Sequence, residues 1–178
     1  MENIKVSMRY AKAIYPVAKQ EGNIINFITD LATIVNAIKQ SRELKLLINS
    51  PIISPAKKTA IFTEIFNEKV SVLAMNFFHL IISKGRAKFI EGIYNCMNII
   101  YNKENNIIKC QIVSAFKLSD DTKKNIEQFL KDTTKGDIIA DYIIDNSIIG
   151  GFLLRIEDKV YDTTIKNKLK KLKKSLLI

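Results

Sequence analysis

Apolar side chains recur at helical spacing along the first part of the chain. Between Ser7 and Gln20 they fall every three or four positions, and Gly22 follows as a stop signal. The next segment carries a stripe that a second helix of about 16 residues would bury. The members of that stripe are Ile24, Phe27, Ile28, Leu31, Ile34, Val35 and Ile38. A proline inside a helix removes a hydrogen bond and clashes with the preceding turn, so we expect a kink at Pro16 in the first helix.

Two shorter helices are predicted next. One runs from Ser41 to Ile48 and ends at Asn49-Ser50-Pro51. The other begins at Ser54-Pro55, where a capping hydroxyl precedes a proline at the first helical position and no backbone amide is missed. Its expected buried face consists of Ile61, Phe62, Ile65 and Phe66.

The fifth predicted helix, from Val72 to Ser83, is apolar on more of its circumference than one buried face requires. It is therefore either central to the fold or partly a binding surface. Gly85 ends this helix, and a sixth helix follows. The apolar stripe of the sixth helix is Phe89, Ile90, Ile93, Tyr94, Met97 and Tyr101.

The segment from Asn102 to Asn106 is the most polar break between apolar patterns, and we expect a domain boundary there. After the break the pattern predicts strands at Ile107 to Ser114 and Asp137 to Asp145, with a helix capped by Ser119 between them. A hairpin from Ile148 to Tyr161 and a final helix follow. The expected fold is an all-α N-terminal six-helix bundle, residues 1–105, followed by a small α+β C-terminal domain, residues 106–178.

Gly150 and Gly151 stand side by side within the predicted hairpin. Glycine weakens a strand unless a bulge or a close backbone approach requires the missing side chain, so we expect one of these at the pair. Glu157-Asp158 can turn the chain, and Asp162 can cap the last helix by accepting hydrogen bonds from its free amides. We interpret the glycine pair and Asp162 as structural residues.

The composition indicates a folded chain without a membrane-spanning segment. Hydrophobic residues make up 47% of the 178 positions. No run approaches the roughly 18 to 20 apolar residues that cross a bilayer. The N-terminus has charges spread through it and lacks the apolar core of a secretory signal, so we expect the chain to stay in the cytoplasm.

The formal charge of +10 is unevenly distributed along the chain. Residues 163–178 contain six lysines and no acidic residue, whereas the other positions carry 22 basic and 18 acidic side chains. With 24 lysines against 4 arginines, and with 31 isoleucines, part of the charge reflects an A+T-rich coding bias. The last helix is either a solvated amphipathic helix or a contact for an acidic partner helix, with a membrane surface or nucleic acid as further alternatives. Its apolar stripe is Ile165, Leu169, Leu172 and Leu176.

Patterns typical of enzymes and metal sites are missing from the sequence. Cys96 and Cys110 with a single histidine cannot supply the usual four zinc ligands, and we expect them to be reduced packing residues. That histidine, His79, lies on an apolar helix, and no G-x-S-x-G motif is present. Ser83-Lys84-Gly85-Arg86 lacks the pattern of a phosphate-binding loop. We therefore expect an interaction protein that has no catalytic residue, metal or cofactor and binds no nucleotide directly.

Three segments resemble the delta subunit of F-type ATP synthases, the bacterial relative of the oligomycin-sensitivity-conferring protein. The first two are RYAKAIYPVAKQEG at Arg9 to Gly22 and NFFHLIISKGRAKFI at Asn76 to Ile90. Pro16, Glu157 and the pair Thr163-Thr164 depart from the family pattern. The third segment matches at Asp145, Ile149-Gly150-Gly151-Phe152, Arg155, Asp158-Lys159-Val160, Asp162, Leu169 and Leu172.

The resemblance implies a non-catalytic peripheral-stalk subunit at the cytoplasmic face of the bacterial plasma membrane, attached to the membrane only indirectly. It implies that the C-terminal domain binds the b subunits, and that the helical domain binds N-terminal helices of the alpha subunits in a groove on the first and fifth helices. The candidate groove residues, whose ordinary interpretation is bundle core, are Tyr10, Ala13, Ile14, Val17, Phe77, Leu80 and Ile81.

A basic module that binds nucleic acid through its lysines is the rival interpretation. Phosphate contacts would make its affinity fall steeply with salt. No aromatic residue follows Tyr161 to stack on bases, which weighs against this alternative.

Overall fold

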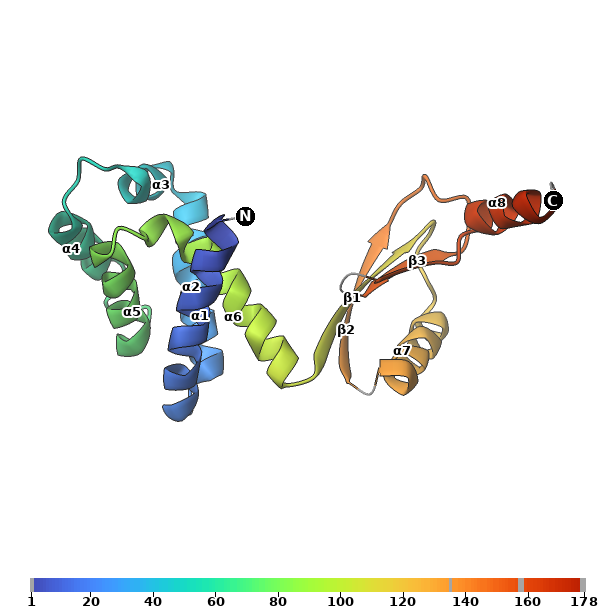
Figure 1. Ribbon diagram of the computed structural model, residues 1–178, viewed down its shortest axis with the longest axis horizontal. Helices are drawn as coiled ribbons and strands as arrows, with labels where there is room; N and C mark the ends of the chain where they lie inside the picture. Colours follow the sequence, from blue (N-terminus) through green and yellow to red (C-terminus); the bar gives the residue numbers. More distant parts are fainter. Residues whose placement is uncertain (1, 135, 157–158, 177–178) are drawn as a thin grey trace. The chain divides into compact units, whose positions relative to one another are not determined.

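The computed structural model describes residues 2–134, 136–156 and 159–176 (Figure 1). The chain divides into two compact units, Met1–Tyr101 and Asn102–Ile178. The division falls at the start of the polar segment that interrupts the hydrophobic patterns. The first unit is helical, and the second combines helices with a small sheet.

Helices form where the hydrophobic spacing predicts them in the N-terminal unit. The serines at positions 41, 54 and 71 each accept a hydrogen bond from a backbone amide of the helix that follows, which confirms the predicted start after Ser54. The elements are α1 (Glu2–Gln20), α2 (Ile24–Gln40), α3 (Arg42–Asn49), α4 (Pro55–Phe66), α5 (Val72–Ser83), the 3-10 turn η1 (Ala87–Phe89) and α6 (Ile90–Glu104), the last of which continues past the division.

Helix α1 differs from the prediction at its beginning. It starts at Glu2 rather than Ser7, because no stop signal interrupts the first turns and Ile4 and Val6 continue the apolar spacing. The helix continues through Pro16, so the proline does not end it. Gly22, with a φ of 69°, ends the helical segment as predicted.

Helix α5 is central to the core of this unit. Its residues Ala74, Met75, Phe77, Phe78, Ile81 and Ile82 are buried. The rings of Phe62 on α4 and Phe78 on α5 meet edge to face, with centroids 4.9 Å apart. Phe27 on α2 meets Phe77 in the same manner at 5.7 Å. The near-continuous apolar surface of α5 is therefore explained largely by burial between α2 and α4.

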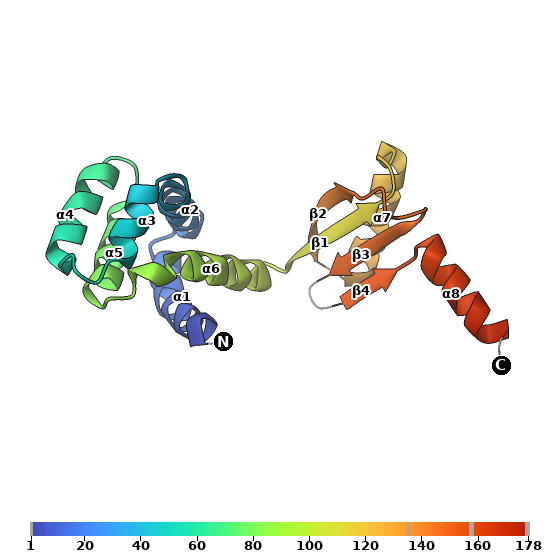
Figure 2. The same ribbon diagram turned by 90° about the horizontal axis from the view of Figure 1, so that it is seen from above.

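The C-terminal unit places one helix against a mixed sheet (Figure 2). The strand order is β2-β1-β3-β4; β1 and β2 are parallel and joined through α7, whereas β3 is antiparallel to both β1 and β4. Cys110, Ile112 and Leu154 from the sheet pack with Ile126 and Leu130 from α7. The elements are β1 (Ile107–Ser114), α7 (Asp120–Thr134), β2 (Asp137–Ile144), β3 (Phe152–Ile156), β4 (Lys159–Asp162) and α8 (Ile165–Leu176).

The predicted hairpin is shorter than expected. Its first strand begins at Phe152 rather than Ile148, because Gly151 has a φ of 80° and therefore cannot continue an extended strand. The predicted turn at Glu157-Asp158 lies outside the described residues. No helix in the described part of the chain is long and apolar enough to cross a membrane.

Candidate docking surfaces

The residues of α1 predicted to form a groove lie partly on the surface. Ala13 is exposed and Val17 is 41% exposed, whereas Tyr10 and Ile14 are half-buried against the core. These four positions follow the i, i+3, i+4, i+7 spacing of one helix face. That face is therefore half core and half surface.

The residues predicted on α5 separate more sharply. Leu80 is 47% exposed, whereas Phe77 is 5% exposed and Ile81 is fully buried. Helices α1 and α5 both pack on α2 and on η1, so the two predicted faces belong to one packed structure. Phe77 and Ile81 can support a docking surface from beneath, and Ala13, Val17 and Leu80 are the members that a partner can reach.

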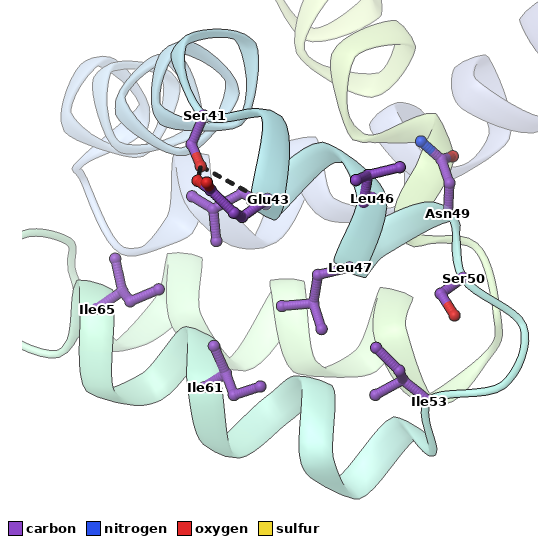
Figure 3. A pocket seen from close by; sticks show the side chains of 10 residues that line it. Ser41, Glu43, Leu46, Leu47, Asn49, Ser50, Ile53, Ile61 and Ile65 are labelled. Atoms are coloured by element: carbon purple, nitrogen blue, oxygen red, sulfur yellow. Dashed lines mark hydrogen bonds between the residues drawn. The ribbon is translucent and has the colours of Figure 1, made fainter.

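An apolar groove between α3 and α4 was not predicted (Figure 3). It has a volume of about 930 Å³. Leu46 on its rim is 61% exposed and Ile61 is 38% exposed, which corrects the prediction that Ile61 is buried with Phe62. The lining residues are Ser41, Glu43, Leu44, Leu46, Leu47, Asn49, Ser50, Ile53, Ile61 and Ile65.

Lys58 fixes the distance between the two helices at one end of this groove. Its ammonium group donates to the carbonyl oxygens of Ile48, at 3.0 Å, and Ser50, at 2.6 Å. These carbonyls lie at the end of α3, where the last turn of a helix has no internal partners for its oxygens. A lysine of α4 therefore caps α3, a function that the sequence pattern did not indicate.

The glycine pair holds the segment that leads into α8. Ile165 donates its amide to the carbonyl of Gly150 at 3.0 Å, and Thr163 donates its amide to the carbonyl of Phe152 at 3.1 Å. A Cβ on Gly151 would lie 2.7 Å from the carbonyl oxygen of Thr163, and a Cβ on Gly150 would lie 2.7 Å from Cδ1 of Ile165. The pair therefore serves a close approach, which is one of the two expected reasons. We call this arrangement the glycine clamp.

The residue that caps α8 is Thr164 rather than Asp162. The Thr164 hydroxyl accepts from the amide of Asn167 at 3.3 Å, as a capping side chain does. Asp162 accepts from the amide and the hydroxyl of Thr164, at 2.9 and 2.6 Å. The predicted cap therefore acts two residues earlier, where it orients the threonine that caps the helix.

Three residues of the apolar stripe of α8 lie at the surface. Ile165 is 45% exposed, Leu169 58% and Leu172 57%. Lys166, Lys168, Lys170 and Lys173 are exposed around the same helix. These three side chains are therefore less buried than the apolar face of an amphipathic helix that packs against its own domain.

The single histidine is hydrogen-bonded at the edge of the N-terminal core. The Thr63 hydroxyl donates to the Thr59 carbonyl at 2.9 Å and lies 3.0 Å from Nε2 of His79. The Thr63 hydroxyl and the His79 ring therefore form a hydrogen-bonded pair, whose direction depends on the tautomer of the ring. His79 is thus a hydrogen-bonded packing residue.

Both cysteine thiols are buried, and burial raises the pKa of each; nearby Asp141 and Glu127 raise the pKa of Cys110 further. Thiols with raised pKa values are poor nucleophiles. Within the described ranges, His, Cys, Asp and Glu side chains form no group of three that could hold a metal ion.

Comparison of the sequence with known proteins identifies a family. Residues 6–176 match the family model described as ATP synthase delta (OSCP) subunit. The ATP synthase subunit delta of Clostridium botulinum strain Loch Maree is 34% identical over 169 residues, which is 95% of this chain and 94% of that protein. The protein of the same name from Clostridium acetobutylicum is also 34% identical over 169 residues, with the same coverage.

A solved structure shares the fold. A chain in the cryo-EM structure of the Toxoplasma gondii mitochondrial ATP synthase hexamer superimposes with a TM-score of 0.70 over 97% of each chain, at 22% sequence identity. The fold described above thus also occurs in a solved structure.

Proposed function

We propose, from the premise that this chain belongs to the ATP synthase delta (OSCP) subunit family, that its two units bind different parts of the enzyme. The chain is a non-catalytic peripheral-stalk subunit of an F-type ATP synthase, which links the catalytic head to the membrane sector and resists rotor torque. The nucleic-acid-binding alternative is not favoured, because the matched relatives are ATP synthase subunits.

The N-terminal domain, residues 1–105, binds N-terminal helices of the alpha subunits in this proposal. The observation that supports it most is that α1 and α5, although packed in one core, leave Ala13, Val17 and Leu80 accessible. An amphipathic helix that docks on such a surface uses a few apolar anchors at helical spacing. A central anchor contributes about 2 kcal/mol or more to binding.

The variant Leu80→Asp tests this site. We expect it to weaken binding of a peptide from the alpha N-terminus at least tenfold, by about 1.4 kcal/mol or more, while circular dichroism stays unchanged because Leu80 is half exposed. Ile25→Asp on α2, at a position 61% exposed, is the matched control and should bind normally. Unchanged binding by Leu80→Asp, or loss of the helical signal, would contradict the assignment.

The α3–α4 groove is a second apolar surface on the same domain. One more variant shows whether the peptide binds at this groove or at the surface of α1 and α5. Leu46→Asp places a charge on the exposed rim of the groove. If Leu46→Asp abolishes peptide binding and Leu80→Asp does not, the head contact lies in the groove. The proposal predicts the opposite order.

The C-terminal domain, residues 106–178, binds the b subunits, and the complex lies at the cytoplasmic face of the bacterial plasma membrane. Contact with the membrane is indirect, and neither nucleotide nor nucleic acid binds directly. Mixing the full-length chain with the cytoplasmic part of a b subunit should give a stable complex in sedimentation. Failure of the two to associate would contradict this part of the proposal.

A further inference from the structure

The apolar stripe of α8 is narrow and regular. Ile165, Leu169 and Leu172 are spaced by four and three residues, which places them within roughly 60° of the helix circumference at 100° per residue. Lys168 lies along one edge of the stripe and Lys173 along the other. An apolar seam with charged side chains on both edges is the pattern of a helix that pairs with another helix.

The glycine clamp holds the beginning of α8 against the sheet through backbone hydrogen bonds. The amides of Thr163 and Ile165 are bonded to the carbonyls of Phe152 and Gly150, so backbone joins backbone on both sides of the cap. Both views show α8 running away from the sheet (Figures 1 and 2). Its 12 residues give it a length of about 18 Å, available to a partner from the side.

We propose that the stripe of α8 docks an acidic amphipathic helix of the peripheral stalk. This inference rests on the proposed binding of the stalk by the C-terminal domain, and it assigns the contact to one helix and the partner to one chemistry. The sequence from 163 to 178 has six lysines and no acidic residue, so a partner with carboxylates beside its own apolar seam complements both the charge and the shape.

An anionic membrane is a different class of partner, and the helix fits it less well. Helices that lie in a membrane interface usually carry a wide apolar face with aromatic residues that enter the acyl region. The stripe of α8 is narrow, and no aromatic residue follows Tyr161 in the chain. Binding of α8 to a membrane is therefore the alternative result that the experiment must distinguish.

Two variants of the full-length chain test the two components of the contact. Leu169→Ser removes the central apolar anchor, and we expect it to weaken binding to the cytoplasmic domain of the b subunit at least about tenfold at low and high ionic strength. Lys168→Glu combined with Lys173→Glu reverses the charge on both edges. We expect a loss of about tenfold or more at low ionic strength and a smaller loss at high ionic strength, where salt screens the repulsion.

Matched controls carry the same changes elsewhere. Ile25→Ser alters an exposed apolar residue of α2, and Lys117→Glu with Lys124→Glu reverses two exposed lysines of the C-terminal domain. Both controls should bind the b subunit like the unaltered chain. Circular dichroism should be the same for all variants, because every altered side chain is exposed.

The results separate the inference from the function on which it rests. If both α8 variants bind the b subunit as tightly as the unaltered chain, the inference is wrong and the stalk-binding domain stands. If the unaltered chain does not bind the b subunit, the proposed function itself fails. If the variants lose binding to phosphatidylglycerol vesicles while keeping the b subunit, α8 is a membrane contact, which also overturns the inference.

Discussion

The two glycines of the clamp are required for different reasons. Gly151 has a φ of 80°, which costs other residues about 1–2 kcal/mol, and it also faces the backbone of Thr163. Gly150 faces only the end of a flexible side chain, Cδ1 of Ile165. Backbone cannot move aside as cheaply as the tip of a side chain. Gly151 is therefore the less replaceable of the pair.

The variant Gly151→Ala should destabilise the C-terminal unit by about 2 kcal/mol or more, since it combines an unfavourable φ with a clash against backbone. Chemical denaturation of the full-length chain, followed by circular dichroism, measures the effect. Gly85→Ala is the control, because Gly85 has a φ of 64° but open space around its Cα. It should cost only about 1–2 kcal/mol, from the unfavourable φ, and equal effects of the two variants would show that the contact with Thr163 is unimportant.

Tyr142 provides a test of the electrostatics beside the C-terminal core. Its hydroxyl donates to Glu127 at 2.9 Å, and burial together with this hydrogen bond and the glutamate charge raises the pKa of Tyr142 from 10.0 to about 12. The folded chain keeps the proton after the unfolded chain has lost it. The stability contributed by this group is therefore complete below pH 10 and falls as pH rises from 10 towards 12.

The folded chain has six tyrosines, and an ultraviolet titration should show that one of them ionises near pH 12. This ionisation step should be missing from the titration of Tyr142→Phe. Glu127→Gln keeps the ring where it is but removes the carboxylate, so it should lower the pKa of Tyr142. A titration curve that Tyr142→Phe leaves unchanged at high pH would refute the assignment.

Sequence reasoning identified the residues of the clamp but not their partners. A glycine pair in an apolar run indicates that something comes close, yet the approaching atoms belong to Thr163, Thr164 and Ile165, more than ten positions later. The sequence pattern favours Asp162 as the cap because an aspartate before a helix is a common cap. Aspartate and threonine both accept hydrogen bonds, so the pattern alone cannot decide which of Asp162 and Thr164 faces the helix amides.

At the scale of elements, Lys58 joins two helices that otherwise leave an open groove between them. The variant Lys58→Met keeps most of the apolar stem but removes the donor to Ile48 and Ser50. We expect a loss of about 1–3 kcal/mol, since hydrogen bonds from a charged group exceed the average and the carbonyls lose their cap.

Thermal or chemical denaturation of the N-terminal unit within the full-length chain measures this loss. Lys57→Met is the matched control: its side chain is exposed, and the backbone amide that Ser54 accepts from is unchanged. The control should stay within about 0.5 kcal/mol of the unaltered chain. Similar values for both variants would mean that solvent replaces the Lys58 hydrogen bonds without loss.

Helical spacing predicted most of the elements because each helix needs an apolar face to join the core. The same spacing cannot tell which apolar positions another helix will cover. Leu80 and Ile81 are neighbours on α5, and one is 47% exposed whereas the other is fully buried. The α3–α4 groove escaped prediction for this reason: Ile61 belongs to the apolar face of α4 but lies where α3 leaves it open.

At the scale of the whole molecule, the two units differ in how much core they contain. Among the described residues, ten of the twelve largest fully buried side chains belong to the N-terminal unit, and only Ile112 and Leu130 belong to the other. A small core gives little surplus over the entropy of folding. The C-terminal unit should therefore open first.

Hydrogen exchange on the full-length chain tests this order. We expect amides of β1 and α7 to exchange through openings of lower free energy than amides of α5, and a bound b subunit to slow exchange selectively in the C-terminal unit. If the most protected amides of both units report the same free energy, the two units unfold together and the expected order is wrong.

The glycine clamp also has a consequence at the level of the gene. Every glycine codon begins with two guanines, whereas 24 lysines against 4 arginines indicate a coding sequence drawn towards adenine and thymine. Such drift removes glycine wherever another residue is tolerated, and only six remain in the chain. Two of the six stand together, Gly151 against the backbone of Thr163 and Gly150 against the side chain of Ile165. The positive φ of Gly151 and the close contacts at both glycines therefore mark two positions of this chain where a codon rich in guanine is kept for a structural reason.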